Sequence, residues 1–162
     1  MVLAALAIGV STSRAVPSGI TVAQVTVPGP NGLDLPGVLF QGSLPPGPQP
    51  AVVLLHGCSG MWKNHVPFET DQGTGEPLVD EVLDKWGREL ASRGITVLAV
   101  DSLTPRTSQD TPDAEWQVQC GWSYDQGVSE NTVRPRDAEA AQAWLAARGD
   151  VDAARIGLMG WS

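Results

Sequence analysis

The sequence predicts an α/β protein in which a mostly parallel sheet carries helices on both faces. Residues 51–55 (AVVLL), 95–100 (ITVLAV) and 155–159 (RIGLM) form short, largely continuous apolar runs. Such runs are typical of strands that are buried on both faces of a parallel sheet. Helical periodicity separates the runs, and two further strands precede them. The order strand, strand, strand, helix, strand, helix, strand indicates strand–helix–strand units that follow a hairpin.

The hairpin is expected near the N-terminus. Residues 21–27 (TVAQVTV) alternate in polarity and are rich in β-branched side chains, which suits a half-buried strand. Residues 28–32 (PGPNG) form a turn cluster, and residues 35–41 continue as the antiparallel partner. The run PPGPQP at 45–50 then separates the hairpin from the first buried strand.

Two helices are expected between the buried strands. The first is predicted over residues 77–93, because Pro77 suits a first helical turn and Gly94 suits the position just after a helix. Thr132 is expected to cap the second helix, with Pro135 in its first turn. The apolar positions with helical spacing are Leu78, Val79, Val82, Leu83, Trp86 and Leu90 in the first helix, and Ala138, Ala141, Trp144 and Leu145 in the second, which ends at Gly149.

Two long loops remain, and both follow buried strands. Residues 61–76 are polar and turn-rich, and we expect them to form a surface loop. Residues 102–130 are too many for a plain connection in a compact domain, and loops of this length are often functional. The aromatic residues of the second loop either wall an apolar substrate pocket or pack the loop down: Trp116, Trp122 and Tyr124.

Composition excludes several classes of function. The 162 residues suit one domain, and a net charge of −8 disfavours binding to nucleic acid or to an anionic membrane. No apolar run reaches the roughly 18 residues of a membrane-spanning helix. Two Cys and two His leave little material for a metal centre, so we expect no metal and no other cofactor.

Residues 1–15 predict a secretory signal. Residues 2–10 (VLAALAIGV) form its apolar core, and Ser13 and Ala15 are small residues before a cleavage point. The mature domain would then span residues 16–162 and be periplasmic or extracellular; with an internal start site or a buried segment, the protein would be cytoplasmic. In an oxidising compartment Cys58 and Cys120 would form a disulfide, and otherwise they are buried thiols. The bridge would close a loop of about 62 residues, worth at most roughly 4 kcal/mol.

Two motifs follow buried strands at the sheet edge where sites of open parallel sheets form. Residues 56–60 (HGCSG) follow the first buried strand, and their glycines allow a sharp turn that presents backbone N–H groups. Residues 160–162 (GWS) follow the last one and match the first half of Gly-x-Ser-x-Gly, the nucleophile elbow.

With these motifs, the chain resembles the N-terminal half of an α/β-hydrolase of the dienelactone hydrolase family. The resemblance covers about residues 20–162 and is carried by VVLLHGCSG, WGRELASRGITVLAVDSLTPR, RPRDAEAAQAWL and ARIGLMGWS. It implies that Ser162 is the nucleophile and that the N–H of Cys58 faces the oxyanion. It also places Arg106 close to the arginine that grips a substrate carboxylate in that family, although this chain has one extra residue between Asp101 and Arg106.

The chain departs from the family in ways that shape the expected function. Dienelactone hydrolases proper have a Cys nucleophile, and a Glu where this chain has His56-Gly57. Both differences favour a serine carboxylesterase or lactonase that uses a small-molecule ester or lactone. The triad acid and His belong beyond Ser162, so we expect a fold truncated after the nucleophile strand, from an incomplete reading frame. The alternatives are a non-catalytic pseudo-enzyme or ligand-binding module, and a serine peptidase of the same fold.

Structural roles are expected for other polar residues at this edge. His56 precedes the nucleophile in the chain, which is the wrong order for a triad His, so it should bond the loop backbone. Asp101 should cap the turn after its strand. His65, with Glu69 and Asp71, belongs to a solvated loop rather than a metal site. Arg106 either stays solvated or binds an anion. Ion pairs among Arg134, Arg136 and Asp137 should contribute little each.

Overall fold

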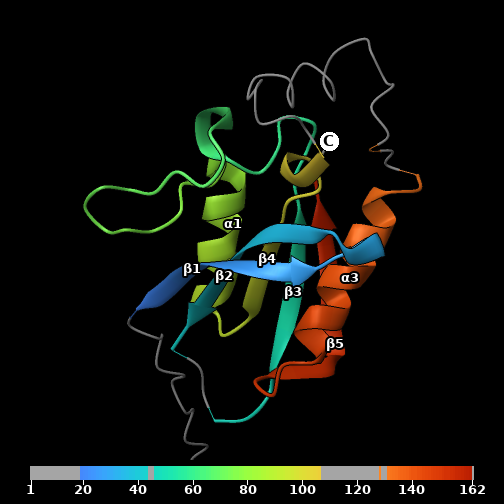
Figure 1. Cartoon of the computed structure of the whole chain (residues 1–162). Helices are drawn as coiled ribbons and strands as arrows, with labels where there is room; N and C mark the ends of the chain where they lie inside the picture. Colours follow the sequence, from blue (N-terminus) through green and yellow to red (C-terminus); the bar gives the residue numbers. More distant parts are fainter. Residues whose placement is uncertain (1–18, 44–45, 107–127, 129–130, 162) are drawn as a thin grey trace, which may run out of the picture.

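The computed structural model of the chain describes residues 19–43, 46–106, 128 and 131–161 (Figure 1). This part contains a five-stranded sheet in the order β1-β2-β4-β3-β5. The strands are β1 (Ile20–Pro28), β2 (Asp34–Gly42), β3 (Gln49–Leu55), β4 (Thr96–Val100) and β5 (Val151–Gly160), the α helices are α1 (Glu81–Ser92) and α3 (Arg134–Ala146), and the 3₁₀ helices are η1 (Pro30–Gly32), η2 (Lys63–His65) and η3 (Thr104–Arg106).

The pairing of the strands confirms the predicted hairpin and the parallel core. β1 and β2 are antiparallel, and β2 is also antiparallel to β4. β3 lies between β4 and β5 and is parallel to both. The carboxyl ends of β3, β4 and β5 therefore lie at one edge of the sheet, where the loops after these strands begin.

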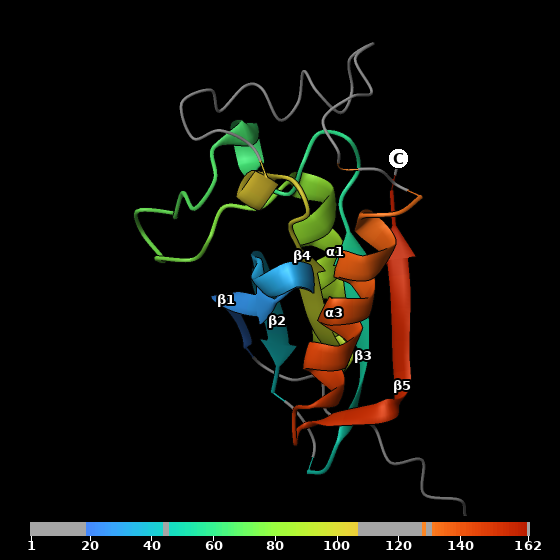
Figure 2. The same cartoon turned by 45° about the vertical axis from the view of Figure 1, so that its right-hand side comes forward.

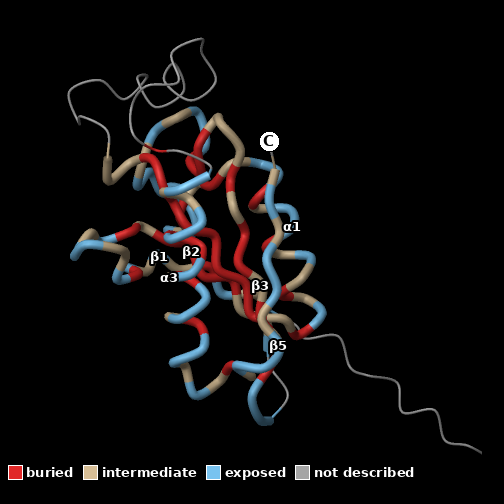
Figure 3. Tube along the Cα trace, turned by 90° about the vertical axis from the view of Figure 1, so that its right-hand side faces the viewer, coloured by how far each residue is buried: buried red, intermediate tan, exposed pale blue. Residues whose placement is uncertain are grey.

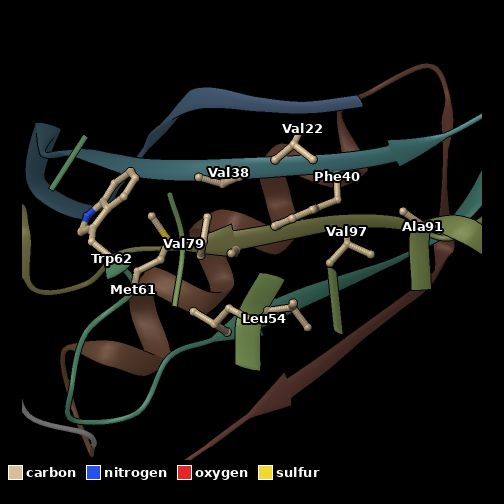
Figure 4. Packing of buried hydrophobic residues seen from close by; sticks show 11 residues of the cluster. Val22, Val38, Phe40, Leu54, Met61, Trp62, Val79, Ala91 and Val97 are labelled. Atoms are coloured by element: carbon tan, nitrogen blue, oxygen red, sulfur yellow. The ribbon is translucent and has the colours of Figure 1, made fainter. Parts of the chain in front are cut away.

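One face of the sheet packs against α1. Phe40, Leu54 and Val97 point to this face and meet Leu83 and Ala91 of the helix, as Figure 4 shows for most of them. A Cβ atom on Gly87 would lie 2.8 Å from the Phe40 ring, so this glycine is what allows the helix and the ring to come so close.

The opposite face packs against α3, as predicted. Ala141 and Leu145 of α3 contact Val53, Leu98 and Val100. Neighbouring residues of β4 thus alternate between the two clusters, as expected for a strand that is buried on both faces. Figure 3 shows α1 and α3 on opposite sides of the strands.

The start of α1 differs from the prediction. The helix begins at Glu81 rather than at Pro77, and Asp80 caps it by accepting a hydrogen bond from Val82 N at 3.0 Å. The aspartate side chain accepts a hydrogen bond from an N–H that has no partner inside the helix. The side chain of Pro77 has no such acceptor. The predicted end is confirmed, because Gly94 has φ +80° just after the helix.

The predicted Thr132 cap of α3 is wrong. Val133 occupies the N-cap position, has helical backbone angles and makes no side-chain cap bond. Pro135 does lie in the first turn, where its missing N–H costs nothing. The helix ends at Ala146, three residues before Gly149.

The prediction of a surface loop at 61–76 is wrong for its first two residues. Met61 is fully buried and Trp62 is 2 % exposed, and both belong to the α1-side cluster. Trp62 also makes an isolated antiparallel bridge to Val79, which ties the loop to the start of α1. Most of the remaining loop is exposed, as expected.

β5 lies at one edge of the described sheet (Figure 2) and is its most exposed strand (Figure 3). It contains the predicted run 155–159 and is longer, because Val151 already pairs with Gln49 before a register shift. Among the described strands β5 pairs with β3 alone, and Leu158 on it is 56 % exposed.

No helix in the described part of the chain is long and apolar enough to cross a membrane.

Candidate active site at the carboxyl edge of the sheet

Three segments meet at the carboxyl edge: the loop after β3, the loop after β4 and the end of β5. The N–H of Trp161 donates to the carbonyl oxygen of Leu55 at 3.2 Å, so the end of β5 lies beside the start of the His56–Gly60 loop. Ser162, the predicted nucleophile, follows Trp161 directly and lies outside the described residues. The structure thus brings together the two motifs that the sequence singled out, up to the residue before the serine.

His56 has the structural role that the sequence predicted. Its side chain is buried, its Nδ1 lies 2.7 Å from the Gly57 carbonyl oxygen, and Ser102 N donates to its Nε2 at 3.2 Å. These partners fit a neutral ring with the proton on Nδ1. Burial lowers the pKa of His56, although Asp101 at 3.7 Å acts in the opposite direction. The ring therefore links the loops after β3 and β4.

Asp101 caps the turn after β4, as predicted. Its Oδ1 accepts hydrogen bonds from Leu103 N at 2.8 Å and Thr104 N at 3.1 Å. Its Oδ2 accepts a bond from the indole Nε1 of Trp62 at 2.7 Å. The carboxylate is fully buried, and these donors replace the water that it loses. Sequence reasoning missed the Trp62 partner.

Cys58 lies in the turn that would face an oxyanion. Gly60 N donates to the Gly57 carbonyl oxygen at 3.2 Å, and Gly60 has φ +83°, so the turn is tight. Cys58 is disulfide-bonded. The one other cysteine of the sequence is Cys120, which lies outside the described residues, so this pairing and the oxyanion role of the Cys58 N–H stay predictions.

The side chain of Arg106 is mostly buried and pairs with a carboxylate of the protein. Its two terminal nitrogens each donate to a different oxygen of Asp137 at 2.8 Å, and one also donates to the Ser102 carbonyl oxygen at 2.6 Å. The side chain of Arg106 is 18 % exposed and that of Asp137 is fully buried. The positive charge is thus matched by a protein carboxylate, and its predicted role in substrate binding stays a prediction.

The charged residues at the start of α3 contact distant loops, whereas the sequence predicted local ion pairs among them. Asp137 pairs with Arg106 across 31 residues of chain rather than with Arg134 or Arg136. Arg134 instead donates from Nη2 to the carbonyl oxygen of His56. The N-terminus of α3 therefore holds the loops after β3 and β4 from the same side.

The loop that contains His65 shows no metal-like arrangement. His65 Nδ1 lies 3.0 Å from the Ser59 carbonyl oxygen. Asp71 accepts bonds from Thr74 and Gly73, and these bonds lower the pKa of its exposed carboxyl. Within the described ranges, no three His, Cys, Asp or Glu side chains gather as metal ligands would.

A hollow of about 220 Å³ lies between the loop after β3, the start of α1 and the end of β5. Its lining combines the turn after β3 with residues from the start of α1 and the residue after β5. The lining residues are His56, Gly57, Cys58, Ser59, Gly60, Asp80, Val82, Leu83 and Trp161. Trp161, which lines this hollow, directly precedes the predicted nucleophile in the chain.

No family model matches the sequence, and no curated protein matches it either. Solved structures do resemble the fold. A candidate dienelactone hydrolase from Klebsiella pneumoniae shares 18 % identity, with a TM-score of 0.59, over 89 % of this chain and 50 % of that chain. A dienelactone hydrolase-like promiscuous phosphotriesterase from metagenomic libraries shares 19 % identity, with a TM-score of 0.58, over 89 % of this chain and 50 % of that chain.

A prolyl endopeptidase is a more distant match, with 15 % identity and a TM-score of 0.51 over 87 % of this chain and 17 % of that chain. The chain spans about half the length of the first two structures. At these identities the likeness shows the fold and nothing finer. The chain has the α/β-hydrolase fold, in the part that runs from the N-terminal hairpin to the end of β5.

Proposed function

We propose that the chain is the nucleophile-bearing part of a serine hydrolase, similar to dienelactone hydrolases, that cleaves carboxylic esters or lactones. The observation that carries this proposal is the bond from Trp161 N to the Leu55 carbonyl oxygen, which brings the residue before Ser162 beside the HGCSG loop. A serine at the tip of such a strand has its hydroxyl above the sheet, next to backbone N–H groups.

In this mechanism Ser162 Oγ attacks the carbonyl carbon of the substrate, and its proton passes to a general base. The N–H of Cys58 donates to the oxyanion that forms. The base then returns the proton to the leaving alcohol as the carbon–oxygen bond breaks, which leaves an acyl-enzyme that water hydrolyses by the same steps. No metal or organic cofactor takes part.

His56 does not serve as the base. Its Nε2 accepts the Ser102 N–H and its Nδ1 faces the Gly57 carbonyl oxygen, so both ring nitrogens already have backbone partners. We therefore propose that the base and its orienting acid follow residue 162 in a longer protein. In support, the chain covers half of two hydrolase-fold structures, and β5 has one strand partner in the described sheet.

We further propose that residues 1–15 direct export and that Cys58 pairs with Cys120. The disulfide state of Cys58 supports an oxidising compartment. Mass spectrometry of protein purified from its native host should find Val16 as the N-terminus and a Cys58–Cys120 peptide pair. An intact Met1 would contradict export, and free thiols trapped by alkylation without reduction would contradict the bridge.

Covalent labelling tests the catalytic proposal. The intact gene product that contains these residues should react with a fluorophosphonate, which loses fluoride and becomes bonded to Ser162 Oγ. Ser162→Ala should abolish both the label and the hydrolysis of p-nitrophenyl butyrate. Ser92→Ala is the matched control, because Ser92 lies at the end of α1, donates to the Glu89 carbonyl oxygen and has no role in the proposal. A label on another residue, or none at all, would favour the non-catalytic alternative.

A further inference from the structure

The hollow that Trp161 lines has an uneven charge distribution. Asp80 lines it at the start of α1, and none of its nine lining residues is Lys or Arg. Asp80 Oδ1 accepts the Val82 N–H as the helix cap, so the carboxylate is held in place at the hollow. A fixed, half-buried carboxylate opposes the entry of a second anion more strongly than one in open water.

The nearby arginines do not offset this charge. Arg106 forms a paired bond with Asp137, which is fully buried. Arg134 donates to the His56 carbonyl oxygen from α3, and neither arginine lines the hollow. The whole chain adds a net charge of −8, which raises the local concentration of cations over that of anions.

The rest of the lining suits a compact cation with an apolar surface. Trp161 lines the same hollow as Asp80, and Trp is the side chain that attracts an ammonium group most strongly. Val82 is 43 % exposed and adds aliphatic surface for methyl groups. The volume of about 220 Å³ is below the roughly 300–1,000 Å³ of sites for drug-sized ligands, so a small head group fits.

We propose that Asp80 is the specificity-determining residue of this site and that the preferred substrates are small esters bearing an ammonium group. This inference rests on the proposed function. Esters of the same size are then used in the order cationic, neutral, anionic. Trp161 and Asp80 together hold the ammonium group while the ester carbonyl meets Ser162.

Three thioesters of one acid test the order with the intact gene product. They are butyrylthiocholine, its uncharged isostere S-(3,3-dimethylbutyl) thiobutyrate, and S-butyryl-3-mercaptopropionate. At low ionic strength, kcat/KM for the cationic ester should exceed that for the neutral one by about 5- to 30-fold, from a screened ion pair and a cation–π contact together. Salt should reduce the ratio.

Asp80→Asn should lower the ratio of cationic to neutral kcat/KM about 3- to 10-fold, because Asn keeps a cap acceptor but not the charge. Glu139→Gln is the matched control, since it removes one exposed charge from α3 on the opposite face and should leave the ratio unchanged. A preference for the anionic ester, or an unchanged ratio in Asp80→Asn, would overturn the proposal.

Binding without turnover separates this proposal from the proposed function. Tetramethylammonium should bind the Ser162→Ala protein in calorimetry, and Asp80→Asn should weaken the Kd about 3- to 10-fold. If no ester is cleaved through Ser162 but this Kd shift appears, the proposed function fails and the ammonium site stands. If esters are cleaved but the Kd is unchanged by Asp80→Asn, the ammonium site fails alone.

Discussion

Removing the guanidinium of Arg106 should destabilise the protein far more than losing a surface ion pair. Asp137 is fully buried and both of its oxygens accept from Arg106 at 2.8 Å. In Arg106→Ala the carboxylate would stay buried without its counter-charge. Breaking a buried pair in this way costs roughly 3–5 kcal/mol, against about 1 kcal/mol or less for an exposed pair.

Two companion variants separate charge from geometry. Arg106→Lys keeps the charge but cannot donate two parallel bonds, so we expect it to cost about 1–2 kcal/mol. The double variant Arg106→Met/Asp137→Leu removes both charges and leaves none uncompensated. Its cost should therefore be smaller than that of Arg106→Ala alone.

The free energy of unfolding can be measured by urea titration of the intact gene product, followed by circular dichroism at constant disulfide state. A loss below about 1 kcal/mol for Arg106→Ala, or additive losses in the double variant, would refute the assignment of a buried pair. Activity gives a second readout. If Arg106 is structural, kcat/KM should fall equally for neutral and carboxylate-bearing esters. A loss of about 10- to 150-fold confined to carboxylate-bearing esters would instead assign Arg106 to the substrate.

Three further variants test the packing and the polar contacts. Gly87→Ala should destabilise by about 1–3 kcal/mol in thermal unfolding despite the higher helix propensity of Ala, because its Cβ would lie 2.8 Å from the Phe40 ring; Lys85→Ala, exposed on the same helix, should not destabilise. Trp62→Phe should cost about 1.5–3 kcal/mol, since the buried Asp101 loses an N–H donor. The pKa of His56 is lower in the folded protein than its ordinary value of 6.5, so below pH 6.5 the unfolded chain binds a proton at this histidine while the folded ring stays neutral. The free energy of unfolding should therefore fall as the pH drops below 6.5. His56→Asn should flatten this part of the curve of unfolding free energy against pH.

The sequence predicted the elements whose signal is local. Continuous apolar runs identified β3, β4 and the centre of β5, because a strand buried on both faces excludes polar residues along its length. The first residues of β5 were missed, since Asp152 breaks the apolar pattern although Val151 pairs with Gln49. The start of α1 was misplaced because Pro77 and Asp80 both resemble helix starts, and the sequence alone does not say which N–H groups need a partner.

The polar contacts at the carboxyl edge were beyond local reasoning. Trp62 and Asp101 are 39 residues apart, and Arg106 and Asp137 are 31 apart. Neither pair lies within one helical turn or one hairpin, where spacing predicts contact. Met61 and Trp62 also gave no periodic signal, since two apolar residues in a polar loop fit a surface as well as a core. They are buried because the folded loop packs them against the α1-side cluster.

These contacts together hold an irregular loop in one arrangement, which the proposed oxyanion role of the Cys58 N–H would require. The loop after β3 makes a tight turn at Gly60, and apolar packing alone would not fix the direction of its N–H groups. His56 anchors the loop through Ser102 N, and Arg134 anchors it through the His56 carbonyl oxygen. Buried polar partners cost free energy when one is removed, so they hold a single arrangement where aliphatic contacts would allow several.

The charges of His56 and Asp80 affect the proposed chemistry. Burial lowers the pKa of His56, and a neutral ring adds no positive charge to the loop after β3. In the proposed mechanism the N–H dipoles would therefore have to stabilise the developing negative charge. Asp80 lies at the same hollow, so its negative charge opposes an oxyanion unless the substrate carries a compensating cation. An ammonium group bound between Asp80 and Trp161 would supply that compensation at the moment the carbonyl oxygen becomes charged. The preference for cationic esters should therefore appear in kcat as well as in KM, because the compensation acts in the transition state and not in binding alone.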